Sequence, residues 1–559
     1  MMRFKILVFS LLSLIIAPCL LAQTDHAWIG TGKVKARITP TGIHRDAEGG
    51  FLLENAIPGQ PSRNLLSHLT PWIGGLDPGN NLKIACEMDD PMVSDWQAGF
   101  RGVPNSGKVW KVTIEQIEAH VMDFEDNGII DHPIAEIFAW PAVGNPFSMD
   151  YNGFSMDSIH YSIDAPFYDL DWDGIYSPQS GEFPFEVAGV DPPFPPQILV
   201  YSPFYDKPIH DLTDGDMIQM DLYSLAFTLD CQEEDFVENA IFFEYCGFLN
   251  TWQERLDSLF LGVFADFDIG NPADDYLGGV SDSYSEMIYC YNADTLNDDL
   301  IGVDPPVISI NCNNYFLDEN DINQPLSHFM PIFPNNFPFS TRVPGTPDEF
   351  YNYLTGTWRD GTPLSWGGIG YNPGTNPPLT PFAFPDNPLN PDGWSERAAE
   401  NPSGNRKCIF SYGPTKIKPY GHKYKLRFAL TTSDKGGLTQ KLLHLNKMND
   451  LQRNIEYGWD GNSPLDSICF PSVAVKEIVP RRFISPNPAN EHCSVFIPDH
   501  KIVDVLILNS LGQKVPIDQP NFIQENEVRI SLKNLPAGIY FLHWKAKNGQ
   551  RGCEKLVKN

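Results

Sequence analysis

The chain has 559 residues, roughly three to four times the length of a typical domain, which indicates several domains or one large β body. Acidic residues number 71 against 39 basic ones; the formal net charge of -32 disfavours binding to nucleic acid or to an anionic membrane surface. With 49 prolines and 44 glycines, long uninterrupted helices are disfavoured, so the sequence predicts a mainly β, loop-rich protein.

The first 23 residues have the pattern of a secretory signal peptide. Arg3 and Lys5 precede an apolar run at residues 6–17, and small residues follow it. This run is short for a membrane anchor, and no stop-transfer pattern follows. We therefore expect residues 1–23 to be removed. We also expect no transmembrane span in the rest of the chain, because no later segment has a long uncharged apolar run.

Residues 24–475 form an acidic body in which several segments have strand patterns. Residues 217–229 and 240–249 combine alternation with continuous apolar runs, as core strands of a sandwich do. Residues 423–432 alternate cleanly, with Tyr424, Leu426, Phe428 and Leu430 on one face. An apolar stripe over residues 438–457 predicts one helix. We expect a large, loop-rich, β-sandwich-like body.

Three clusters of acidic residues in the body have the spacing of calcium-binding loops. In the clearest, Asp169, Asp171 and Asp173 occupy positions 1, 3 and 5, and a glycine at position 6 permits the sharp turn. Carboxylates at these positions converge on one point, and the backbone carbonyl of Ile175 adds a further ligand. Position 12 is not a glutamate, so Glu182 is the candidate to complete the site.

The other two clusters give similar expectations. The expected ligands of the second are Asp123, Glu125, Asn127, Ile129 through its backbone, Asp131 and Glu136. Those of the third, which follows an apolar strand at 259–264, are Asp266, Asp268, Asp274 and Asp275. Solvated acidic turns without metal are the alternative for all three, because Asp, Asn and Gly favour turns. The predicted cofactor is calcium in a structural role, since it removes the repulsion between clustered carboxylates.

Motifs for catalysis are absent from the sequence. It contains no H-E-x-x-H, G-x-S-x-G, Walker or dinucleotide-binding motif. The histidines near acidic residues have no helical metal-binding spacing, which favours structural roles; they are His120, His132, His160 and His210. We favour a binding or structural role over catalysis. A secreted hydrolase acting on polysaccharide or protein is the alternative.

An aromatic-rich segment with little periodicity offers a candidate ligand surface. Its large side chains are Trp358, Trp366, Tyr371, Phe382, Phe384 and Trp394. Flat aromatic faces stack on sugar rings or on a protein partner. The alternative is that these side chains cover the core beneath a long loop.

Residues 476–559 differ from the body in charge and in pattern. They carry 12 basic and 8 acidic residues. Short β patterns recur at residues 493–497, 503–508, 528–532, 538–544 and 553–557. The region therefore predicts a separate, small, immunoglobulin-like β-sandwich. Its two cysteines, Cys493 and Cys553, would pair if their strands lie adjacent.

Four motifs follow one another in this region: ISPNPAN at 484–490, LNSLGQKV at 508–515, LPAGIYFL at 535–542 and KLVK at 555–558. Their order and spacing resemble the type A C-terminal sorting domain of the type IX secretion system of Bacteroidota. The resemblance implies an export address that the secretion machinery recognises at the outer membrane. It also implies a secreted or surface-attached protein, with the sorting domain commonly removed during export.

Three strings in the body carry a second resemblance: PWIGGLD at 71–77, WPAVGN at 140–145 and FPDNP at 384–388. Together with the first and third aspartate clusters, they are similar to a family of large secreted Bacteroidota proteins. This similarity implies one continuous secreted unit and no particular activity.

Overall fold

The computed structural model describes most of the chain after the predicted signal peptide. The described residues are 23–54, 62–156, 163, 165–171, 173–185, 196–229, 235–250, 255–281, 286–294, 296–297, 302–303, 305–312, 324–417, 424–456, 484–485, 489–496, 502–509, 514–517, 520–524, 527–546 and 551–558. Residues 1–22 of the predicted signal peptide, His160 and the predicted domain boundary at 476 lie outside them.

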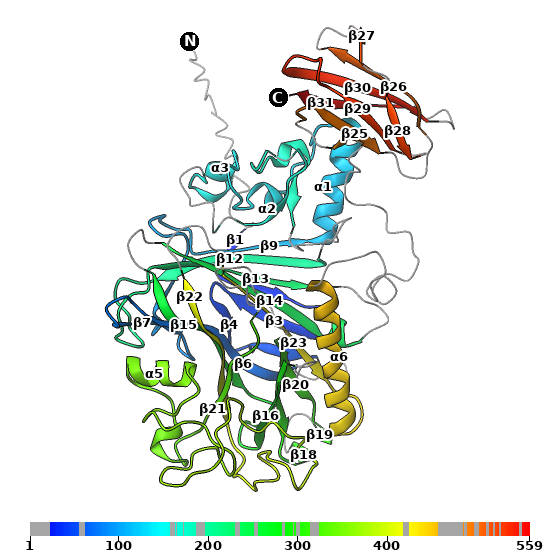
Figure 1. The fold of residues 1–559 in the computed structure, drawn as a ribbon. Coiled ribbons are helices and arrows are strands. Elements are labelled where there is room, and N and C mark those ends of the chain that lie inside the picture. The colour runs from blue at the N-terminus through cyan, green and yellow to red at the C-terminus, as the bar shows by residue number, and fades with distance from the viewer. Residues whose placement is uncertain are drawn as a thin grey trace, which may run out of the picture.

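Two large antiparallel sheets form the body (Figure 1). The strands of the first sheet run in the order β1 (Gln23–Thr24), β9 (Val109–Thr113), β12 (Ile198–Asp206), β13 (Met220–Thr228), β14 (Ala240–Leu249), β23 (Tyr424–Ser433), β20 (Val307–Asn311), β17 (Glu286–Asn292) and β16 (Asp275–Ser281), with β8 (Trp96–Ala98) beside β12. Those of the second run in the order β2 (Ala27–Ile29), β3 (Val34–Thr39), β4 (Gly42–His44), β6 (Arg63–Leu76), β15 (Leu256–Phe267), β22 (Arg406–Ile417) and β21 (His328–Ile332), with β5 (Phe51–Leu53) and β7 (Leu82–Ala85) beside β6. The predicted sandwich-like body is confirmed.

The central strands are buried on both faces, which explains their continuous apolar sequences. In β14, Ile241 and Phe243 face the core between the two sheets, whereas Phe242 faces a second core on the other side. Successive side chains of a strand point to opposite faces, so apolar surroundings on both sides select apolar residues throughout. Across the main core the rings of Phe410 and Phe428 lie 5.9 Å apart and join the sheets.

A layer of helices and a short hairpin packs on the outer face of the first sheet, and the second core lies between this layer and the sheet. The layer contains α1 (Ile114–Asn127), α2 (Ala135–Phe138), α3 (Ser148–Asn152) and a hairpin of β10 (Phe167–Tyr168) and β11 (Phe183–Pro184), with the 3₁₀ turn η2 (Pro178–Ser180) between its strands. Trp110 and Tyr201 of the sheet and Trp140 and Tyr176 of the layer are buried in this second core. We call this segment the accessory layer (Figure 1).

Helices and short strands cover the remaining faces. The predicted helix at 438–457 is α6 (Leu438–Glu456), whose Leu445 packs on β17 and β20. The outer face of the second sheet is covered by α5 (Pro347–Leu354), where Phe350 contacts Trp72 with ring centroids 4.9 Å apart. The remaining elements are α4 (Asp235–Glu238), η3 (Phe339–Thr341), β18 (Leu296–Asn297) and β19 (Gly302–Val303). No helix in the described ranges is long and apolar enough to cross a membrane.

The aromatic-rich segment mainly covers the second sheet. Trp358, Phe384 and Trp394 belong to the main core and are buried. Of its six large aromatic side chains only Trp366 is exposed, with 42% of its surface accessible. These side chains therefore do not form a broad aromatic surface for a ligand.

The last domain consists of two four-stranded sheets. One has the order β24 (Ile484–Ser485), β25 (His492–Phe496), β29 (Glu527–Ser531) and β28 (Asn521–Gln524); the other has the order β27 (Lys514–Val515), β26 (Ile502–Asn509), β30 (Gly538–Ala546) and β31 (Arg551–Lys558). Val495, Ile507 and Leu542 are buried between them, so the predicted small β-sandwich is confirmed. The strands of Cys493 and Cys553 lie in different sheets, and Cys493 is a free, buried thiol.

Candidate functional site

The first aspartate cluster lies in the loop of the accessory-layer hairpin. The hairpin is paired at Phe167 with Pro184 and at Tyr168 with Phe183. In the loop, one carboxylate oxygen of each of Asp169, Asp171 and Asp173 lies within 4.8 Å of the other two. The spacing in the sequence therefore corresponds to three carboxylates that meet in space.

Hydrogen bonds within the loop hold these carboxylates together. The backbone N–H of Gly174 donates to Asp169 at 3.0 Å, that of Asp173 to Asp171 at 3.2 Å and that of Ile175 to Asp173 at 2.7 Å. Gly174 has a φ of 75°, a left-handed conformation that glycine adopts without strain. The backbone thus turns around the three carboxylates as a coordinating loop requires.

Glu182 braces this loop from its buried side. Its carboxylate accepts the backbone N–H of Leu170 at 2.9 Å and that of Ser177 at 2.7 Å, so both oxygens have protein donors. Burial raises the pKa of Glu182 to about 7. The charges of Asp169 and Asp171 also raise this pKa, whereas the two backbone hydrogen bonds lower it. Contrary to the expected ligand role, Glu182 is not gathered with the three aspartates.

The inner side of the loop is anchored in the second core. Tyr176 is fully buried; its hydroxyl donates to the carbonyl of Ile137 at 2.9 Å, and its backbone N–H donates to the carbonyl of Val143 at 2.8 Å. On the outer side, Asp171, Asp173 and Ile175 are exposed. The loop therefore presents its carboxylates to solvent from a fixed base.

These residues fit a hard divalent cation. All the side-chain donors are carboxylate oxygens, which calcium prefers, and water completes its six to eight ligands at an exposed site. The backbone carbonyl of Ile175 follows the turn at Gly174 and remains the expected additional ligand. Three carboxylates this close repel one another, and a bound cation removes that cost.

The second motif does not form a coordinating loop. Asp123, Glu125 and Asn127 lie in the last turns of α1, and Gly128 ends this helix with a φ of 79°. The expected loop is wrong because its glycine serves as the helix C-cap. In a helix, residues two apart do not share a face, so Asp123 and Glu125 diverge.

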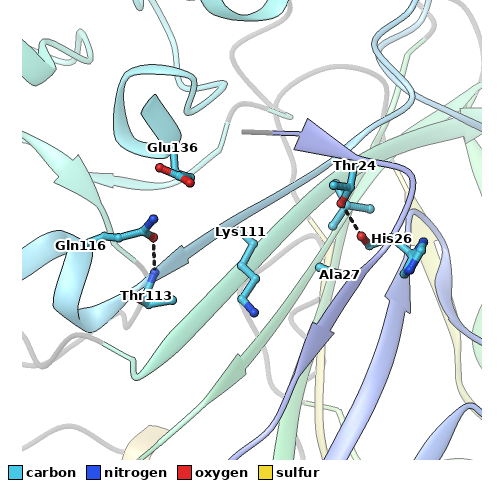
Figure 2. Close-up of a pocket in the computed structure, with 8 residues that line it drawn as sticks. Thr24, His26, Ala27, Lys111, Thr113, Gln116 and Glu136 are labelled. Carbon is cyan, nitrogen blue, oxygen red and sulfur yellow. Dashed lines mark hydrogen bonds between the residues drawn. The ribbon is translucent and has the colours of Figure 1, made fainter. Parts of the chain in front are cut away.

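The other expected ligands of this motif have local partners or lie elsewhere. Asn127 donates to Asp131 at 2.9 Å and accepts the backbone N–H of Ile129 at 2.8 Å, and both Ile129 and Asp131 are exposed. Glu136, on α2, lines a pocket of about 290 Å³ beside Lys111 and Gln116 (Figure 2). The Lys111 ammonium there donates to the carbonyl of Trp28 at 2.7 Å.

The third cluster is divided among separate partners. Asp268 accepts hydrogen bonds from Asn64 at 3.2 Å, from Ser67 at 3.0 Å and from Arg45. Burial raises the pKa of Asp268. Asp266 instead lies 3.3 Å from the ammonium of Lys407. Neighbouring protein groups thus already provide a partner for one oxygen of each carboxylate.

Asp275 is the most buried member of this cluster. Its carboxylate accepts the backbone N–H of Ile269 at 3.3 Å, and burial raises its pKa well above the ordinary value. Asp274 lies immediately before β16, which begins at Asp275. Within the described part of the chain, these two residues, Asp266 and Asp268 do not converge on one point, contrary to the expectation.

Another group was not anticipated from the sequence. One atom of each of His68, Asp89 and Asp266 lies within 4.8 Å of the other two. No motif joins residues so far apart in the chain. The alternation within each strand does not predict that His68 and Asp266 lie side by side, because this depends on the pairing of β6 with β15.

The described histidines near acidic residues include two buried ones with structural surroundings. His120 lies 3.0 Å from the carbonyl of Glu182, and burial lowers its pKa to about 4. His210 lies 4.0 Å from the carboxylate of Asp95 and 3.8 Å from that of Asp206, and all three side chains are fully buried. Burial alone would lower the pKa of His210, but the two aspartates raise it.

This raised pKa predicts a pH-dependent contribution to stability. A folded-state pKa above the unfolded value favours folding at acidic pH, and this contribution is lost as pH rises through the folded pKa. We expect the free energy of unfolding of the wild type to fall more steeply above pH 6.5 than that of His210→Asn. Urea unfolding at several pH values measures both slopes, and parallel profiles would refute a charged His210 in the fold.

Comparison with known proteins bears on the last domain. Residues 484–559 match the family described as the secretion system C-terminal sorting domain. The chain ends in a type IX sorting domain. This domain indicates export by the type IX secretion system, and therefore secretion or attachment at the outer surface. It also implies an interaction between the sorting domain and the type IX machinery.

The other two comparisons give no information on the activity of the body. No curated protein matches the chain significantly. Among solved structures, a polysaccharide lyase is similar at 8% sequence identity and a TM-score of 0.19; the match covers 61% of this chain and 34% of the lyase chain. The chain thus spans about a third of that lyase, and so low a TM-score carries no argument about activity.

Proposed function

We propose that this protein is a secreted or surface-attached β-sandwich protein with a binding or structural role, whose accessory layer is stabilised by calcium. The observation that carries the proposal is the convergence of Asp169, Asp171 and Asp173 in one hairpin loop. The sorting domain supports it independently, because it directs the body to an environment where calcium is abundant. Affinities on the order of 10⁻⁴ to 10⁻³ M are usual for extracellular modules and suffice there.

The physical role of the ion follows from the position of the loop. The hairpin has only two paired residues on each strand, so its own backbone pairing is weak support for a loop of this length. Tyr176 and Phe183 are fully buried next to the loop. If carboxylate repulsion opened the loop, these rings would lose their packing in the second core. Calcium would keep the loop closed and so keep both rings in place.

Calcium should therefore raise the melting temperature of the mature protein. With free calcium at about 10 to 100 times its Kd, a folded-state ligand adds about 1.4–2.7 kcal/mol. For a body of this size, that corresponds to a shift of about 1.5–3 °C. Thermal unfolding followed by circular dichroism, with excess calcium and with chelator, measures the shift. Asp171→Asn and Asp173→Asn should each reduce it strongly.

Glu125→Gln provides the matched control. Glu125 is an exposed acidic residue of the second motif, which forms no coordinating loop. This variant should keep the full calcium-dependent shift. Coincident melting curves for the wild type with calcium and with chelator would contradict the proposal, as would an equal shift in wild type and Asp171→Asn.

A further inference from the structure

A row of polar side chains crosses four adjacent strands of the second sheet. His44 of β4 is paired with His68 of β6, His68 with Asp266 of β15, and Asp266 with Lys407 of β22. Directly paired residues project from the same face, so the four side chains are neighbours. Asp89, from the segment after β7, joins them through a contact with Lys407.

Two buried atoms in this row have hydrogen-bonding capacity that the protein does not use. In the described part of the chain, Oδ1 of Asp266 and Nδ1 of His68 have no hydrogen-bond partner. The side chain of Asp266 is only 9% exposed, and Nδ1 of His68 lies 3.5 Å from its other oxygen. A buried polar atom without a partner is costly and needs an explanation, for which a bound ion or water is one.

We propose that His68, Asp89 and Asp266 form a second metal site, which takes a borderline transition-metal ion such as Zn²⁺ in exchange for the ammonium of Lys407. One donor atom of each residue lies within 4.8 Å of the other two. An imidazole nitrogen with two carboxylates is a donor set that suits zinc, whereas calcium prefers oxygen ligands alone. This site is separate from the aspartate loop and does not depend on it.

Lys407 is the competitor for this position. Its ammonium lies 3.3 Å from Asp266 and also contacts Asp89, so it occupies the position of the metal charge. One ammonium leaves the two carboxylates with a net negative charge, whereas a divalent ion beside a neutral imidazole balances them. Its side chain is 16% exposed beside Asp89, whose side chain is 43% exposed, so the long lysine has a route to solvent. Zinc therefore gains two carboxylates when Lys407 withdraws.

The test is a zinc titration of the full mature chain by calorimetry at neutral pH. The wild type should bind Zn²⁺. Lys407→Met should bind it about tenfold more tightly, and His68→Gln should bind it at least about tenfold more weakly. Asp89→Asn, at the exposed edge of the site, gives a second weakened variant that keeps the fold. Circular dichroism and urea unfolding establish that each variant is folded.

The outcomes separate a metal site from an ion pair. A zinc isotherm that is the same in wild type, His68→Gln and Asp89→Asn overturns the proposal, because binding then lies elsewhere. Absence of zinc binding in both wild type and Lys407→Met also overturns it and leaves Lys407 as a permanent counter-ion. Asp171→Asn, which tests the calcium loop, should leave zinc affinity unchanged, so failure at one site is distinguishable from failure at the other.

Discussion

Deletion of residues 476–559 should abolish delivery of the body to the cell surface and leave it in the periplasm. The deleted part contains the whole sorting domain at 484–559, which the secretion machinery has to recognise. The body folds around its own two cores, so the truncated protein should remain folded. Cell fractionation and protease accessibility at the surface, followed by immunoblotting, measure the loss, which should be nearly complete.

Point variants show whether the folded sandwich is the recognised element. Leu542 is fully buried in the core of the sorting domain, and Leu542→Asp should unfold it and reproduce the deletion. Lys533→Gln changes an exposed side chain of the same domain and should leave export intact. Surface display of the truncated protein at the wild-type level would show that another part of the chain carries the export signal.

Arg406→Met should destabilise the body by about 3–5 kcal/mol, because it leaves a fully buried carboxylate without its counter-ion. Arg406 donates to Glu396 at 2.9 and 2.7 Å, and both side chains are fully buried. It also donates to the carbonyl of Pro402 at 2.6 Å, and Glu396 accepts the backbone N–H of Leu277 at 2.8 Å. The pair thus ties the end of the aromatic-rich segment to β22 and β16. Urea unfolding measures the loss.

The matched control is an exposed ion pair in the same sheet. Lys416 lies 3.5 Å from Asp257, and the lysine side chain is 62% exposed. Lys416→Met should cost no more than about 1 kcal/mol, since solvent screens surface pairs. If Arg406→Met lowered the free energy of unfolding as little as this control does, the buried pair would not be what holds the segment to the sheet.

Sequence periodicity was sufficient where the apolar pattern of a strand matches its burial in the fold. The predicted segment 240–249 coincides with β14, and 423–432 lies within one residue of β23 at each end. In these strands, local pattern and tertiary burial demand the same residues. The same agreement made the helix at 438–457 predictable as α6.

Ligand spacing alone was not sufficient for the aspartate clusters. The first and second motifs have the same spacing, but the second follows a helix-forming stretch that has a capping box at Thr113 and Gln116. Helix formation therefore continues through Asp123, Glu125 and Asn127 until Gly128 ends it. The first follows a two-residue strand and has no such competitor, so its residues are free to form the loop.

The polar row of the second sheet was beyond the reach of sequence reasoning. His68 and Asp266 become neighbours only because β6 and β15 pair, and Lys407 only because β22 pairs with β15. These pairings bring together residues from distant parts of the chain. Their registers are set by packing across the whole sandwich rather than by local pattern.

The most direct test of the central claim is calcium binding by the mature protein, measured by equilibrium dialysis with radioactive calcium. The aspartate loop predicts saturable binding with a Kd on the order of 10⁻⁴ to 10⁻³ M. Asp169→Asn combined with Asp173→Asn should lose this binding, while Glu125→Gln keeps it. Identical binding curves for the double variant and the wild type would contradict the claim that these carboxylates hold the ion.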